Sequence, residues 1–170
     1  MDRIRIAGVV KESIVDGPGL RYAIFTQGCA HRCPECHNPE TWDFNGGYEC
    51  EFEKIIKSIE ENPLLDGVTF TGGDPLYQPQ ACYELGLLLK EKKLNILVFT
   101  GYTFEEIEEL KVKDQWVEKL MSITDILIDG RYDNSQRDLT LLFRGSKNQR
   151  VIDMNKTRET GKMVLDERYI

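Results

Sequence analysis

The chain has 170 residues, with 22 basic and 29 acidic side chains and a formal net charge of −7 at pH 7. This acidic balance argues against nucleic acid or an anionic membrane as the main partner, and it favours a protein or a small molecule. The length predicts a single domain, residues 1–170, with a sizeable buried core.

No apolar run approaches the ~20 residues that span a bilayer, and no apolar core with a cleavage site stands at the N-terminus. The chain contains five cysteines, three of them within one loop. Such a set makes a poor disulfide framework and suits a reducing compartment. We therefore expect a cytoplasmic protein.

The first half of the chain alternates strand and helix patterns. Residues 4–15 alternate loosely and predict an edge hairpin before the turn cluster at residues 16–19. Residues 20–27 are apolar and aromatic with few charges, which predicts the first central strand. Residues 51–62 carry the apolar stripe of an amphipathic helix, and residues 67–72 predict a short buried strand.

The alternation continues through the second half. Residues 79–93 predict a helix with Cys82 in its buried stripe, and residues 95–100 predict the third strand. Residues 103–106 have the pattern of a capping box that opens a helix, and a further helical stripe follows it. Residues 125–128 predict a fourth strand, which ends in an Asp-Gly turn.

These repeated units predict the class of fold. Strands that alternate with helices form a parallel sheet with outer helices, because crossover connections between parallel strands are right-handed. After Asp129 the pattern weakens: residues 139–143 and 150–154 are strand-like, with a polar loop between them. We therefore predict an α/β fold, an incomplete, open (β/α) barrel with a parallel sheet and outer helices.

The loop after the first central strand holds Cys29, Cys33 and Cys36 in a C-x-x-x-C-x-x-C spacing. Since open α/β folds place their sites at the carboxyl ends of parallel strands, this loop is expected at the rim of the sheet. Three thiolates can hold an iron-sulfur cube and leave one iron open for a substrate.

Two other interpretations of these cysteines remain open. Structural zinc requires four ligands. The candidates for the fourth ligand are His31, His37, Cys50 and Cys82. A thioredoxin-like dithiol would use Cys33 and Cys36, but that motif belongs between a strand and a helix and gives Cys29 no role. Outside these alternatives, His31 is expected to be exposed to solvent.

Three segments carry a resemblance to a known family. Residues 16–21 (DGPGLR), 25–29 (FTQGC) and 36–43 (CHNPETWD) resemble the signature of radical S-adenosylmethionine enzymes that activate glycyl-radical enzymes. The resemblance implies an open barrel, a 4Fe-4S cluster held by the three thiolates, and S-adenosylmethionine bound to the open iron through its amino and carboxylate groups.

The resemblance also implies a cofactor loop. Gly72, Gly73 and Asp74 resemble the family's element for the methionyl ammonium, where glycines allow backbone carbonyls to approach and the carboxylate adds charge complementarity. An ordinary turn after a strand is the alternative. Asp129 is expected near the ribose or the methionine, with a helix cap as the alternative.

The nucleoside is expected beside the last cysteine. Backbone groups of Glu35, Cys36 and His37 are predicted to hold it, with His37 or Asn38 adding polar contacts to the adenine edge. Glu35 departs from the family, which commonly has an aromatic residue at this position. Stacking on adenine by residue 35 is therefore not expected.

Residues 71–76, 100–103 and 143–150 resemble one branch of the family, the activating proteins of anaerobic ribonucleoside-triphosphate reductase. The resemblance implies that a 5′-deoxyadenosyl radical removes a hydrogen atom from a backbone glycine of the reductase, with reduced flavodoxin or ferredoxin as electron donor. The basic loop from Arg144 to Arg150 is a candidate for recognising the reductase, with a plain solvated loop as the alternative. Alternative functions are the activation of another glycyl-radical enzyme such as pyruvate formate-lyase, a small zinc-binding interaction module, and a passive iron-sulfur electron carrier.

Overall fold

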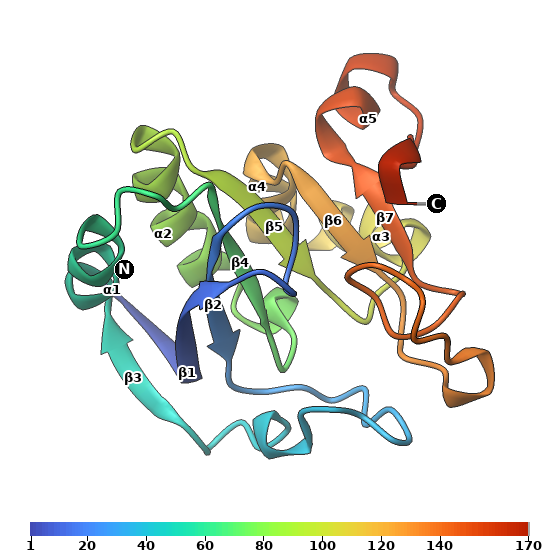
Figure 1. Ribbon diagram of the computed structural model, residues 1–170, viewed down its shortest axis with the longest axis horizontal. Helices are drawn as coiled ribbons and strands as arrows, with labels where there is room; N and C mark the ends of the chain where they lie inside the picture. Colours follow the sequence, from blue (N-terminus) through green and yellow to red (C-terminus); the bar gives the residue numbers. More distant parts are fainter. Residues whose placement is uncertain (170) are drawn as a thin grey trace.

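The computed structural model describes residues 1–169, and its sheet is built around four neighbouring parallel strands (Figure 1). These are β2 (Arg21–Thr26), β4 (Gly67–Gly72), β5 (Asn95–Phe99) and β6 (Ile126–Asp129). All four were predicted within one or two residues of these bounds. Because the strands are parallel, the loops that follow them gather at one rim of the sheet.

Three antiparallel strands extend the sheet at its two ends. β1 (Arg3–Ser13) pairs with β2, and β3 (Tyr48–Glu51) pairs with β1. β7 (Arg150–Asp153) pairs with β6 at the other end. The strand order β3-β1-β2-β4-β5-β6-β7 does not close on itself, which confirms the predicted open barrel.

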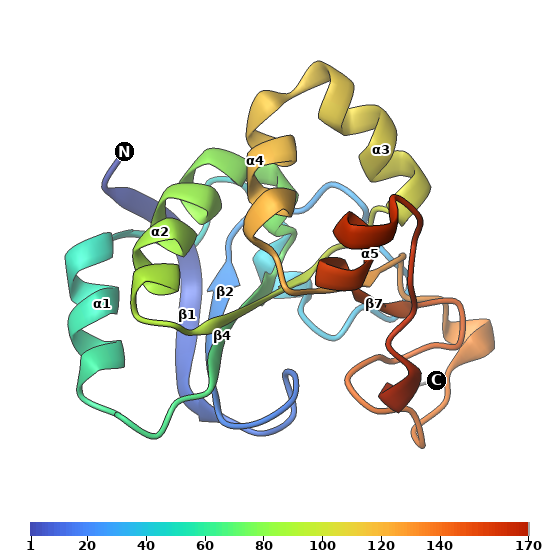
Figure 2. The same ribbon diagram turned by 90° about the horizontal axis from the view of Figure 1, so that it is seen from above.

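The helices connect the parallel strands and cover one face of the sheet (Figure 2). They are α1 (Phe52–Glu60), α2 (Pro79–Glu91), α3 (Phe104–Lys113) and α4 (Gln115–Ile123), and α5 (Met154–Thr160) follows β7. Short 3-10 turns occupy Pro39–Thr41, Pro75–Tyr77, Asn134–Gln136 and Glu167–Tyr169. The predicted capping box of α3 is confirmed, with Thr103 and Glu106 exchanging backbone and side-chain hydrogen bonds. Among the described helices, none is long and apolar enough to cross a membrane.

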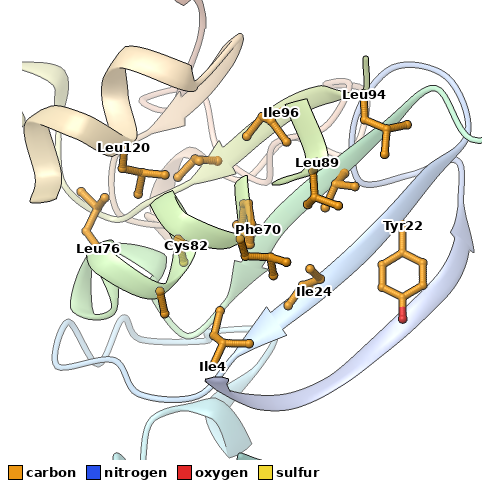
Figure 3. Packing of buried hydrophobic residues seen from close by; sticks show 14 of the residues in the cluster. Ile4, Tyr22, Ile24, Phe70, Leu76, Cys82, Leu89, Leu94, Ile96 and Leu120 are labelled. Carbon is orange, nitrogen blue, oxygen red and sulfur yellow. The ribbon is translucent and has the colours of Figure 1, made fainter. Parts of the chain in front are cut away.

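The main core lies between this face of the sheet and the helices (Figure 3). Ile24, Phe70 and Ile96 project from neighbouring strands, and Leu89 and Leu120 meet them from α2 and α4. All five side chains are fully buried. Burial of each such side chain contributes roughly 1.5–3 kcal/mol to folding stability relative to exposure. This layer therefore stabilises the strands whose ends form the rim.

The opposite, inner face carries a smaller apolar cluster. Its buried members are Leu97, Ile126, Ile128 and Val151. Phe143 and Tyr169 cover this cluster in place of a helix. Since side chains alternate across a strand, Phe25 of β2, Thr71 of β4 and Phe99 of β5 line a cavity on this face. The inner face is thus free for a ligand near the rim.

Two predictions of secondary structure were wrong, and one helix was missed. Residues 4–15 do not fold into an edge hairpin: most of them form the single strand β1, which pairs with β2, while the unpredicted β3 takes the edge. Residues 139–143 form turns and bends, and β7 takes the place beside β6. Helix α5 lacks a long apolar stripe and was not predicted.

Candidate functional site

The three clustered cysteines lie in the loop between β2 and β3. The stems of this loop pair through Gly28 N–H to Thr41 O (2.7 Å) and Cys29 N–H to Trp42 O (3.2 Å). Between them, Cys36 N–H donates to Cys33 O (3.1 Å) and closes a tight turn. The loop needs left-handed backbone at two non-glycine residues, with φ of 50° at Arg32 and 59° at Glu35. As a result all three cysteines line one hollow of ≈ 130 Å³ at the rim.

Two thiols of this hollow, those of Cys29 and Cys33, are favoured in their neutral form by burial. Burial raises the pKa of Cys29 from 9.0 to about 11, and burial likewise raises the pKa of Cys33 above its usual value. Metal binding must therefore release these protons, since the thiolate is the ligand.

The donor set fits a cluster better than a single ion. Within residues 1–169, no three His, Cys, Asp or Glu side chains lie close enough to hold one metal ion. In an iron-sulfur cube each thiolate binds a different iron, so the sulfurs need only surround a common space, as these three do. Two of the candidates for a fourth zinc ligand do not line this hollow: Cys50 lies in β3, and Cys82 is fully buried in α2.

The predicted cofactor loop packs directly against the cluster loop. Gly73 N–H donates to Thr26 O (2.8 Å), and Asp74 N–H donates to Gly28 O (2.9 Å). A Cβ on Gly73 would lie 2.5 Å from Gly28 O, and Gly72 has a φ of +99°, so neither position accepts a side chain without strain. Both glycines line the hollow of the three cysteines. The glycines therefore permit close approach of two loops; their contact with a methionyl ammonium stays a prediction.

The two predicted carboxylates do not line the hollow. Asp74 is 1% exposed, and both of its side-chain oxygens accept hydrogen bonds from the chain itself. Asp129 is fully buried, accepts from Phe104 N–H (2.7 Å) and pairs with Arg150 at 2.5 Å. For Asp129 the structure shows the alternative role, a cap of α3. Direct charge complementarity with a cofactor has no support at either residue.

Residues beside the last cysteine border a larger cavity. Cys36, His37 and Asn38 line this space of ≈ 530 Å³ on the inner face of the sheet, whereas the exposed Glu35 lines neither it nor the hollow. Sequence reasoning missed Tyr132, which borders both spaces and packs on the His37 ring with centroids 5.0 Å apart. An aromatic residue three positions after a strand that ends at the rim was the available signal.

The loop from Arg144 to Arg150 is held within the fold. Arg144 donates to Gln149 O (2.9 Å) and Tyr169 O (2.6 Å), and Arg150 pairs with Asp129 and Glu105. These contacts give the arginines a structural role, and recognition of a partner by this loop stays a prediction. Exposed apolar side chains surround the mouth of the larger cavity instead. They are Ile14 (74% exposed), Val15 (71%), Leu139 (82%) and Leu142 (55%).

His31 is also placed differently from the prediction. Its side chain is only 5% exposed, and its Nε2 lies 2.7 Å from Oδ2 of Asp74. The imidazole is thus a buried part of the rim and is not available as a fourth zinc ligand.

Comparisons with known proteins agree with this site. A family described as a 4Fe-4S single cluster domain matches residues 15–152. The anaerobic ribonucleoside-triphosphate reductase-activating protein of Enterobacteria phage T4 is 35% identical over 144 residues, which cover 81% of this chain and 86% of the phage protein. The chain belongs to this 4Fe-4S single cluster family. A single 4Fe-4S cluster is therefore its metal centre.

Two further proteins are similar, one over a smaller part of both chains and the other with a low structural similarity score. The pyruvate formate-lyase-activating enzyme of Clostridium pasteurianum is 39% identical over 112 residues, 62% of this chain and 47% of that enzyme. The crystal structure of QueE from Escherichia coli aligns with a TM-score of 0.44 at 19% identity, over 59% of this chain and 54% of QueE.

Proposed function

We propose that this chain activates an anaerobic ribonucleoside-triphosphate reductase by generating a glycyl radical on it, with a 4Fe-4S cluster and S-adenosylmethionine as cofactors. The observation that carries the proposal is the shared hollow of Cys29, Cys33, Cys36 and the Gly72-Gly73 turn, beside a larger cavity. The phage relative is named for the same activity and is similar along most of its length.

Each side of the site has a separate task in this proposal. Cys29, Cys33 and Cys36 hold three irons and leave the fourth open. When bound, the cluster supplies one electron that cleaves S-adenosylmethionine to a 5′-deoxyadenosyl radical. Backbone carbonyls at Gly72 and Gly73 face the methionyl ammonium from the same hollow.

The larger cavity receives the nucleoside and the glycine segment. Cys36, His37 and Asn38 approach the adenine, and Tyr132, whose ring packs against His37, adds an aromatic surface beside them. Phe25 and Phe99 line the inner wall, which limits water around a reactive radical. A backbone glycine of a large enzyme reaches this cavity only if its segment leaves that enzyme and enters through the open side of the barrel.

The remaining assignments are parts of the same proposal. Residues 1–170 act as one domain in the cytoplasm, and reduced flavodoxin or ferredoxin supplies the electron. The alternative partner is another glycyl-radical enzyme such as pyruvate formate-lyase. The relative with that name is matched over less of both chains, so it does not favour the alternative.

The test reconstitutes the cluster without oxygen and measures iron, sulfide and S-adenosylmethionine cleavage. We expect about four irons per chain in the wild type, and loss of cleavage in Cys29→Ala, Cys33→Ala and Cys36→Ala. Cys50→Ala is the matched control, since Cys50 lies away from the hollow. Full cleavage in Cys36→Ala, or zinc in place of iron, would refute the assignment.

The partner is tested by electron paramagnetic resonance after anaerobic incubation with a purified reductase. A glycyl radical on the reductase, dependent on both cofactors, supports the proposed partner. A radical on pyruvate formate-lyase but none on the reductase supports the alternative activase instead. Cleavage of S-adenosylmethionine with no radical on either enzyme contradicts both.

A further inference from the structure

A buried side-chain contact joins the cluster loop to the loop that follows β4. His31 lies between Cys29 and Cys33, and its Nε2 is 2.7 Å from Oδ2 of Asp74. The imidazole is 5% exposed and the carboxylate is 0% exposed. These residues are 43 positions apart in the chain, so the contact connects two separate loops at the rim.

The same carboxylate also receives donors from a third loop. Thr100 Oγ1 (2.9 Å) and Gly101 N–H (3.0 Å), both directly after β5, donate to Oδ2 of Asp74. Leu76 N–H donates to the other oxygen, Oδ1, at 3.0 Å. Asp74 thus holds together the loops after β2, β4 and β5, and His31 supplies the only side-chain donor that the described part of the cluster loop gives it.

The surroundings of the imidazole fix its orientation. Its ring meets the ring of Tyr102 edge-on, with centroids 4.7 Å apart, and Tyr102 in turn donates to the hydroxyl of Tyr77 at 3.1 Å. A Cβ at Gly101 would lie 2.6 Å from Cδ2 of His31, so the ring occupies space that only glycine leaves open. The ring is therefore held with Nε2 directed at Asp74.

We propose that His31 is a positioning residue that sets the place of the cluster loop relative to the Gly72-Gly73 turn. The proposal rests on the proposed function, because its purpose is the alignment of cluster and S-adenosylmethionine. Hydrogen bonds to charged groups are stronger than neutral ones, and a buried bond has little competition from water. Without it, the thiolates of Cys29 and Cys33 keep their chemistry but lose their fixed distance from the cofactor loop.

Two variants separate the hydrogen bond from the ring. His31→Phe keeps a flat ring against Tyr102 but removes the donor. His31→Gln places an amide nitrogen where Nε2 lies and restores the donor. Tyr102→Phe is the matched control, since it removes a nearby, partly buried hydrogen bond that does not involve the cluster loop.

The first measurement uses the metal-free protein and is independent of the proposed function. Amide hydrogen exchange is followed at Cys29 and Cys36, whose N–H groups donate to Trp42 and Cys33. We expect exchange about tenfold faster in His31→Phe, and rates within about twofold of wild type in His31→Gln and Tyr102→Phe. Equal rates in wild type and His31→Phe would overturn the proposal.

The second measurement uses the cluster-loaded protein. Addition of S-adenosylmethionine should change the electron paramagnetic resonance spectrum of the reduced wild-type cluster, and the concentration needed should rise about 10- to 100-fold in His31→Phe. His31→Gln should restore most of this affinity. If His31→Gln is as impaired as His31→Phe, the hydrogen bond is not the cause and the proposal fails. If the wild type itself shows no spectral change, the proposed function fails, while the exchange experiment still decides the role of His31.

Discussion

Loss of the Arg150 side chain is expected to destabilise the fold. Arg150 donates to both oxygens of Asp129, a carboxylate that is 1% exposed, while Arg150 itself is 28% exposed. Hydrogen bonds to Asp129 and then Glu105 raise the pKa of Arg150 above its ordinary value, so the guanidinium stays charged at any accessible pH. Arg150→Met, which keeps the aliphatic stem, leaves this carboxylate without its counter-charge.

The magnitude follows from what remains around Asp129. Removal of one partner of a buried ion pair costs about 3–5 kcal/mol. Two backbone donors, Phe104 N–H at 2.7 Å and Arg150 N–H at 3.2 Å, still reach the carboxylate, and partial exposure of the arginine reduces the effect. We therefore expect Arg150→Met to lower the free energy of unfolding by about 2–3 kcal/mol.

Urea denaturation of the metal-free protein under reducing conditions measures this change. Glu105→Gln is the matched control, because Glu105 contacts the same guanidinium but is 63% exposed; it should cost less than about 0.5 kcal/mol. A loss below about 1 kcal/mol in Arg150→Met, or an equal loss in Glu105→Gln, would refute the reasoning. If the expected loss is observed, Arg150→Glu does not test recognition of a partner, because the substitution acts through the fold.

Three further predictions concern the site. Gly73→Ala should lower iron loading as well as cofactor affinity, because its Cβ would lie 2.5 Å from Gly28 O and displace the start of the cluster loop; iron analysis measures this. The metal-free protein should lose stability as the pH rises from 9 to 11, because the unfolded chain releases the Cys29 proton near its ordinary pKa of 9.0 while the folded chain holds it to about 11. Leu139→Asp with Leu142→Asp should reduce the glycyl-radical yield on the reductase and spare S-adenosylmethionine cleavage, since both side chains are exposed at the cavity mouth.

Each of these predictions has a control within the chain. Gly8→Ala adds a Cβ with nothing within 4 Å, so it should leave iron loading unchanged. The loss of stability between pH 9 and 11 that is attributed to Cys29 should be absent in Cys29→Ser, and an identical pH dependence in wild type and variant would contradict the assignment. Val112→Asp changes an apolar residue that is 88% exposed at the end of α3, away from the cavity. If it reduces radical yield as much as the leucine variants do, the mouth is not the recognition surface.

The parallel strands were predictable from local pattern because each is short, apolar and bounded by turn residues. The capping box of α3 was predictable for the same reason, since Thr103 and Glu106 are three residues apart. In contrast, β3 has only four residues with mostly exposed side chains, and its pairing with β1 depends on a distant segment. Residues 139–143 have the apolar composition of a strand, but β7 takes the place beside β6 and these residues form turns and bends.

In the site too, features set by neighbouring residues were predictable and features set by contacts between distant segments were not. The cysteine spacing indicated a shared metal centre because all three thiols come from one short loop. The environment of His31 and Asp74 was missed because it depends on a contact between loops 43 residues apart. Asp129 was predicted at the cofactor from its position at a strand end, yet Arg150 and the start of α3 occupy its oxygens. Position along a strand tells which rim a residue reaches, but not which neighbour its side chain meets there.

The segment between β6 and β7 gives this fold a way to change partners during evolution. Residues 130–149 contribute much of the cavity wall, including Tyr132 and Leu142, but no strand. Because β6 and β7 are antiparallel neighbours, the ends of this segment are held close together whatever its length. Doubling a loop of this kind costs only about 0.6 kcal/mol in closure entropy. Insertions and substitutions here can therefore accumulate under selection for a new target enzyme, while Cys29, Cys33 and Cys36 in the separate loop after β2 keep their arrangement.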